Sequence, residues 1–178
     1  MSHDTAELRH EPFQVDPHDK ADLFRRFDMV RVRIEGLVHT FRTRFDNQLF
    51  GTTSMIVSPF SHTVVSDEFY PFCKPWEGDF RRELRGMGLG TLAHTLVLLQ
   101  ILQELDEPSR WKMRHVSVSG EENKHRKSID RMGNAESRTR PVPLLPYIDN
   151  AMAACRAIGF LLDEVAYHSA SLGICDHR

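Results

Sequence analysis

Three glycines at alternate positions, followed by a helix-like segment, form the stretch of this sequence best suited to bind a ligand. The stretch is Arg85-Gly86-Met87-Gly88-Leu89-Gly90-Thr91, and residues 85–90 are called the glycine loop below. Because glycine has no Cβ, backbone N–H groups in such a loop can approach a ligand closely and adopt positive φ angles. Thr91 can cap a helix, and a helix N-terminus offers N–H donors and a partial positive charge. These features predict a site for a phosphate or pyrophosphate group.

Two known patterns fit the glycine loop. The first six residues resemble, without a gap, the Arg/Gln-x-x-Gly-x-Gly/Ala signature of the GNAT acyltransferase superfamily, whose loop binds the pyrophosphate of acyl-coenzyme A. This resemblance implies that acetyl-coenzyme A or another acyl-coenzyme A contacts Arg85, Gly86, Met87, Gly88, Leu89, Gly90 and Thr91. Residues 88–93 also fit the Gly-x-Gly-x-x-Gly/Ala dinucleotide fingerprint, so an NAD-type nucleotide-binding protein is an alternative. That fingerprint follows a hydrophobic strand, whereas residues 77–84 do not form a buried strand pattern.

A second segment, residues 122–133, resembles the Asn-x-x-Ala-x-x-x-Tyr-x-x-x-Gly segment of GNAT proteins, which lines the pantetheine arm of the coenzyme. Asn123 matches the Asn of that pattern, and the resemblance implies coenzyme contacts from Asn123 and Ser128. The Tyr of the pattern, a frequent general acid, would fall near Asp130 and is absent. A GNAT-like protein that binds coenzyme or a partner without catalysis is therefore a further alternative.

Residues 147–160 also resemble the second GNAT segment, with slightly short spacing from Asn150 to Gly159-Phe160. The segment that ends at Gly133 is favoured for coenzyme contact because it follows a predicted strand directly. Which of the two segments is the second coenzyme-contacting helix stays open at this point.

Acyl transfer to an amine needs a base for the nucleophile, a donor for the tetrahedral oxyanion and a route for the thiolate to leave. GNAT enzymes commonly supply the base as a Glu from the strand before the loop, sometimes through a water. The resemblance makes Glu68 our base candidate and Asp67 the second choice. The simpler alternative is that both carboxylates face solvent. The ten histidines are scattered without metal-ligand spacing, so we assign no metal.

Length and composition limit the classes of protein that fit. A chain of 178 residues suits one compact domain, and its net charge of −2 gives no support for a nucleic-acid binder. Three widely spaced cysteines do not indicate a complete disulfide framework. The first 12 residues are too polar for a signal peptide, and the most apolar segment, Leu92–Leu105, is short for a membrane span. We expect a cytoplasmic protein with no membrane or nucleic-acid partner.

Hydrophobic periodicity predicts a helix and then several strands before the glycine loop. A short amphipathic helix is expected at residues 20–28. Alternating apolar and polar residues then predict extended segments at 29–35, 38–45, 52–57 and 63–72. Gly36 is expected to break or bulge the first extended run, and Asp46-Asn47 to form a turn.

After the glycine loop, the sequence predicts a helix at 91–107 that Pro108 ends. This helix is apolar almost all round, so it should be packed on several sides. A short strand at 115–120, an irregular stretch at 134–146 and a helix at 147–158 should follow.

The order of these elements favours the GNAT resemblance over a doubly wound dinucleotide fold. It implies an α/β (α+β) fold with a central, mostly antiparallel mixed sheet that is flanked by helices and splayed at the coenzyme site. Residues 1–19 are expected to form an arm, and 20–178 a single acyltransferase-like domain with an irregular insertion at 134–146. The expected activity is acyl transfer, with acetyl as first choice, to an amine-bearing small molecule or protein. A homodimer is one oligomeric state open to such a protein.

Overall fold

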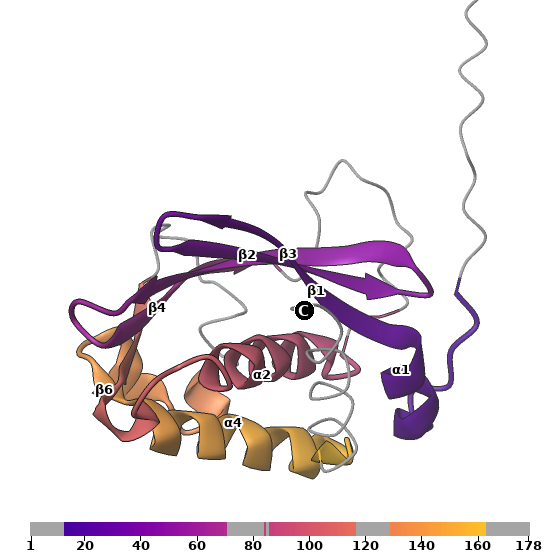
Figure 1. The fold of residues 1–178 in the computed structure, drawn as a ribbon. Coiled ribbons are helices and arrows are strands. Elements are labelled where there is room, and N and C mark those ends of the chain that lie inside the picture. Colours follow the sequence, from indigo (N-terminus) through magenta and orange to yellow (C-terminus); the bar gives the residue numbers. More distant parts are fainter. Residues whose placement is uncertain (1–12, 71–83, 85, 117–128, 163–178) are drawn as a thin grey trace, which may run out of the picture.

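In the part of the chain that the computed structural model describes, six strands form one mixed sheet in the order β1-β2-β3-β4-β5-β6 (Figure 1). The structure describes residues 13–70, 84, 86–116 and 129–162. The strands are β1 Phe27–Glu35, β2 Val38–Phe45, β3 Gln48–Ser58, β4 Thr63–Tyr70, β5 Lys112–Val116 and β6 Val142–Pro143. Strands β1 to β4 pair antiparallel, β5 runs parallel to β4, and β6 pairs antiparallel with β5. The predicted mostly antiparallel mixed sheet is therefore confirmed.

The four-stranded meander follows from alternating side chains and two tight turns. Asp46 and Asn47 both have positive φ angles, 48° and 63°, as a two-residue hairpin turn between β2 and β3 requires. Gly36, at φ 59°, lies in the turn between β1 and β2, so it ends the first strand and does not bulge it. Strand β3 begins earlier than predicted, at Gln48, because the Asp46-Asn47 turn feeds it directly.

Helix α2, Leu89–Leu102, lies in the chain between β4 and the parallel strand β5. Figure 1 shows it directly below the sheet, with α4 on its other side. Ten of its 14 residues are buried, which confirms the prediction that it packs on several sides. The predicted C-terminus is wrong, because α2 ends five residues before Glu107 and Pro108 instead begins the short helix η3, Pro108–Arg110.

Helix α4, Leu144–Ile158, packs against α2 and ends at Gly159, which has φ 111°. The sequence placed the start of this helix at residue 147. Pro146 lies within its first turn, where proline is tolerated because no helix carbonyl is available to its position. The short helix η4, Ala135–Arg138, lies in the stretch that the sequence predicted to be irregular.

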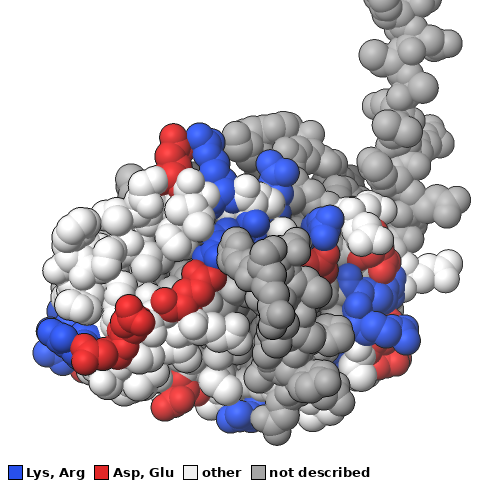
Figure 2. All heavy atoms as spheres, in the orientation of Figure 1, with Lys and Arg blue, Asp and Glu red and all other residues white. Residues whose placement is uncertain are grey.

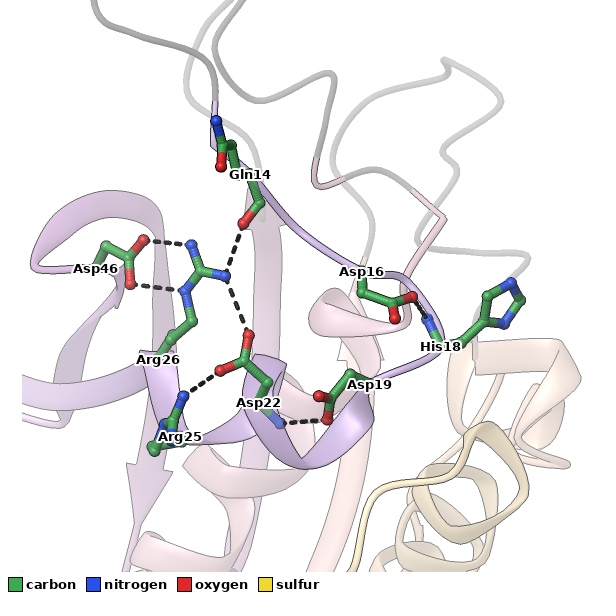
Figure 3. Close-up of polar contacts among 8 residues, drawn as sticks. All are labelled: Gln14, Asp16, His18, Asp19, Asp22, Arg25, Arg26 and Asp46. Carbon is green, nitrogen blue, oxygen red and sulfur yellow. Dashed lines mark hydrogen bonds and ion pairs between the residues drawn. The ribbon is translucent and has the colours of Figure 1, made fainter.

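Helix α1, Lys20–Arg26, is fixed against the β2–β3 turn by Arg26 (Figure 3). The Arg26 guanidinium donates to both carboxylate oxygens of Asp46, at 2.9 and 2.6 Å. It also donates to the Gln14 carbonyl and to Asp22. The hydrogen bonds from Arg26 hold the pKa of Asp46 below its usual value. The network joins residues 14–22, α1 and the turn, and so sets the position of Lys20 at the start of α1.

The surface gives no single-sign region on the face drawn in Figure 2, where Lys and Arg atoms lie beside Asp and Glu atoms. The ion pairs among the described residues include Arg31 with Glu104 and Arg44 with Asp28. Among the helices that the structure describes, none combines the length and apolar character needed to cross a bilayer.

Candidate functional site

The glycine loop forms a turn that opens helix α2. Gly86 and Gly88 have positive φ angles of 74° and 83°, as the glycine pattern predicts. Gly88 is the N-cap residue and Leu89 the first helical residue, so the prediction that Thr91 caps the helix is wrong. The helix begins two residues earlier because Gly88 can adopt the left-handed conformation that ends the turn. Arg85 lies outside the described residues.

Packing explains the glycine at position 88 without any ligand. A Cβ built on Gly88 would lie 2.6 Å from Ile158 Cγ2 and 3.4 Å from Phe160 Cε2, so the C-terminal end of α4 covers this side of the loop. Gly86 differs, because it is exposed and a Cβ there would meet no atom within 4 Å. Of these two glycines, only Gly86 faces open space.

The first turn of α2 has the electrostatic character that an anion needs. The first intrahelical bond described runs from the Leu92 N–H to the Gly88 carbonyl, so no carbonyl of the helix can accept from the N–H groups of Leu89 and Gly90. No acidic residue lies in this turn. Lys20 brings a positive charge to the loop, since its Nζ donates to the Met87 carbonyl at 3.1 Å. The same ammonium lies 5.7 Å from the ring centroid of Phe160.

The two predicted base candidates lie in β4, on the chain segment before the glycine loop. The backbone of Asp67 pairs with Ser54 of β3 and with Val116 of β5, and this is the last described pair between β4 and β5. Glu68 follows it, two positions beyond Ser66. The side chains of residues 67–70 are outside the described part. The predicted splay of the sheet would lie beyond the Asp67–Val116 pair. Residues 117–128, which follow Val116, are outside the described part.

The second predicted coenzyme segment is described only at its end. Asn123 and Ser128 lie outside the described residues. Ile129 and Met132 are buried against Ala151 of α4, and Gly133 has φ 79°. Asp130, at the position of the GNAT Tyr, forms an ion pair with Arg138.

The alternative segment, residues 147–160, lies almost entirely in α4. Asn150, its counterpart of the GNAT Asn, donates to Asn134 Oδ1 at 3.0 Å, which ties α4 to η4. A Cβ built on Gly159 would lie 3.1 Å from Lys20 Cγ, and one built on Gly88 would lie 3.4 Å from Phe160 Cε2, so this segment packs beside the glycine loop.

A group of buried polar side chains lies between the sheet, α2 and α4. A 2.8 Å hydrogen bond joins His94 Nε2 of α2 and Tyr147 Oη of α4. His94 is fully buried, and burial lowers its pKa to about 3, with a further contribution from His115. Burial also raises the pKa of Tyr147. The Cys155 thiol of α4 donates to Thr95 Oγ1 at 3.3 Å, and burial raises its pKa to about 11.

The sequence predicted that the helix at 91–107, which contains His94, packs on several sides, and the burial of His94 agrees with this, but the sequence did not indicate Lys20, Tyr147 or Ile158 as site residues. Each of them reaches the site by a contact between distant parts of the chain. Lys20 and Met87, for example, are 67 positions apart. The sequence offered only an indirect signal. Gly159 predicts the end of the helix at 147–158, but it does not show which part of the chain that end contacts.

Comparison of the chain with protein-family models, curated proteins and solved structures gave no significant match. Within the described ranges, no group of three or more His, Cys, Asp or Glu side chains is arranged to hold a metal ion.

Proposed function

We propose that this protein is an acyl-coenzyme A-dependent N-acyltransferase of GNAT type, which transfers an acyl group, in first place acetyl, to an amine. The observation that carries the proposal is the position of the glycine loop. It opens the buried helix that connects β4 to the parallel strand β5, after a four-stranded antiparallel meander. Ligands of α/β proteins commonly bind at the carboxyl ends of parallel strands and at such helix N-termini.

The residues at the loop fit a pyrophosphate on the open side. The N–H groups of Leu89 and Gly90 would donate to the phosphates, and the exposed Gly86 leaves room for close approach. Lys20 adds a positive charge beside the loop. Acetyl-coenzyme A would supply a thioester for direct attack by an amine, in which a C–N bond forms and the C–S bond breaks.

The carboxylate of Glu68 would accept the proton that the attacking amine loses, with Asp67 as the second choice. The departing thiolate also needs a proton. Asp130 stands where GNAT proteins carry the Tyr acid, but its carboxylate is engaged in an ion pair with Arg138, so we assign it no acid role.

The NAD-type alternative has less support. The dinucleotide fingerprint belongs to a fold of parallel strands, whereas the four described strands before the loop pair antiparallel. A non-catalytic coenzyme binder differs from our proposal only in chemistry, so an activity measurement separates the two.

Thermal unfolding with ligands tests the proposal. Acetyl-coenzyme A at about 100 times its Kd should add roughly 2.7 kcal/mol of stability and raise the Tm by about 5–10 °C. NADH should cause no shift. Release of free thiol with a panel of amines then identifies an enzyme. A shift without thiol release would favour the non-catalytic binder, and a shift with NADH alone would favour the nucleotide binder.

Substitution of Gly90 connects binding to the loop. A carboxylate in the first turn of a helix stabilises the helix but repels a phosphate, so Gly90→Asp should fold and yet lose the acetyl-coenzyme A shift. Gly90→Asn is the matched uncharged control and should keep most of the Tm shift caused by acetyl-coenzyme A. An undiminished shift in Gly90→Asp would contradict the proposed binding mode.

The proposed base is tested separately. Glu68→Gln should lower turnover by about 10²-fold or more and leave coenzyme affinity nearly unchanged.

A further inference from the structure

Two buried hydroxyl groups between the sheet and α2 have no hydrogen-bond partner among the described residues. They are Thr53 Oγ1 of β3 and Ser66 Oγ of β4, on residues that are 1% and 0% exposed. Other buried hydroxyls of the protein do have acceptors. Thr43 Oγ1 donates to the Gly51 carbonyl at 3.2 Å, and Ser137 Oγ donates to the Asn134 carbonyl at 2.6 Å.

An unpaired hydroxyl in a protein interior is costly, because it has lost its water and gained nothing in exchange. Nearly all buried polar side chains in proteins therefore find a partner in protein or in ordered solvent. Valine in place of Thr53 and alanine in place of Ser66 would avoid this cost at almost the same volume. The two hydroxyls thus indicate a polar group that binds between them.

The sheet register brings the two residues close together. Met55 of β3 is the direct partner of Ser66, and Thr53 precedes Met55 by two residues on the same buried face. Thr53 and Ser66 are therefore diagonal neighbours on adjacent strands. Such residues are about 7–8 Å apart in a regular ladder, and the β3–β4 register shifts at Thr53. One small molecule can bridge their side-chain oxygens when both turn toward it. His115, the partner of Ser66 on β5, adds a third buried polar side chain beside this position.

We propose that Thr53 Oγ1 and Ser66 Oγ bind one ordered internal water molecule between the sheet and α2. A water fits because both residues are closed off from solvent and both hydroxyls can donate or accept. This inference does not depend on acyl transfer. It concerns a site inside the domain, on the strand that also carries Glu68.

The sign of two stability changes tests the proposal. If the hydroxyls bind a water, Thr53→Val and Ser66→Ala should each lower the Tm by about 2–4 °C. Thr43→Val and Ser137→Ala are matched controls, since they remove equally buried hydroxyls that have protein acceptors, and they should lower the Tm by similar amounts. A raised Tm for Thr53→Val or Ser66→Ala would overturn the proposal, because removal of an unpaired hydroxyl stabilises a protein.

A double variant tests whether one water is shared. If it is, the combined loss in Thr53→Val/Ser66→Ala should be clearly smaller than the sum of the two single losses. Fully additive losses would contradict a shared molecule. A high-resolution crystal structure of the unsubstituted protein should then show solvent density within hydrogen-bond distance of both oxygens, and a site without density would also overturn the proposal.

Discussion

Gly88 shows how one position can satisfy a ligand-binding pattern and a packing requirement together. Its φ of 83° needs glycine, and its α-carbon is covered by Ile158 at the end of α4. Gly86 has a similar φ of 74° but open space beside it. The sequence pattern treats the two glycines as equivalent, whereas the structure assigns one to packing and leaves the other facing solvent.

This difference predicts unequal costs for the same substitution. Gly86→Ala should lower the free energy of unfolding by about 1–2 kcal/mol, because alanine strains a left-handed backbone. Gly88→Ala should cost about 1–3 kcal/mol more, since its methyl group overlaps Ile158. Urea unfolding measures both values. Adding Ile158→Ala should recover part of the extra cost in Gly88→Ala and none in Gly86→Ala, and equal costs for the two glycines would contradict the described packing.

His94 makes stability sensitive to acid. Its pKa is near 3 in the folded protein and near 6.5 when unfolded, so the unfolded chain binds the proton more readily. The stabilisation by neutral His94 is complete above pH 6.5 and is lost progressively as the pH falls from 6.5 toward 3. At pH 5 the loss from this group alone is about 2 kcal/mol.

The free energy of unfolding should fall between pH 7.5 and pH 5 in the parent protein and in His94→Gln. We expect this fall to be about 2 kcal/mol smaller in His94→Gln than in the parent protein. Urea unfolding at the two pH values gives this difference directly. His39→Gln is a suitable control. The pKa of His39 is also lowered, by burial and by Arg31, but its side chain is only partly buried. An unchanged pH dependence in His94→Gln would show that His94 is not buried as a neutral group.

Among the secondary-structure elements, the strands and turns of the meander were the most predictable from sequence. The strands predicted from alternating apolar residues and the Asp46-Asn47 turn follow from local signals, and both are confirmed, although Val30, Val32 and Ile34 of β1 are exposed. The end of α2 was mispredicted because the apolar pattern continues to Leu105, while the chain leaves the helix after Leu102. Glu104 there pairs with Arg31 of β1, a contact between residues 73 positions apart that no local pattern reveals.

Helices α2 and α4 bury a thiol that can report on their packing. Cys155 is completely buried, donates to Thr95 Oγ1, and has a pKa raised to about 11, so very little thiolate forms near neutral pH. We expect Cys155 to resist a thiol reagent at pH 7.5 in the native protein and to react at once in denaturant. Peptide mapping by mass spectrometry identifies this cysteine. Labelling under native conditions at the rate of an exposed thiol would mean that the two helices separate readily.

In the molecule as a whole, the candidate site depends on contacts among α1, the glycine loop and the end of α4. The glycine pattern was enough to predict the loop and a buried helix after it, although the helix begins at Leu89 and not at Thr91. It could not predict that Lys20 bonds to Met87 or that Ile158 covers Gly88, because these contacts depend on how distant elements pack. The base candidates Glu68 and Asp67 remain predictions, as do Arg85, Asn123 and Ser128.

Arg26 holds this arrangement together from the other end of α1. Its guanidinium donates to Asp46, Asp22 and the Gln14 carbonyl (Figure 3). It also lies 4.8 Å from the ring centroid of Phe45. A planar fork of donors is needed for this set of partners, and lysine cannot replace it.

Arg26→Lys should therefore lower the free energy of unfolding by about 1–2 kcal/mol, which corresponds to a fall in Tm of about 2–8 °C. Arg25→Lys is the matched control, because the neighbouring Arg25 is largely exposed and pairs only with Asp22 among the described residues. It should change the Tm by less than about 2 °C, as expected for a surface ion pair. If the Arg26 network also fixes Lys20 at the glycine loop, Arg26→Lys should weaken acetyl-coenzyme A binding while Arg25→Lys leaves it unchanged. Equal melting points for the two variants would show that Arg26 is an ordinary surface residue.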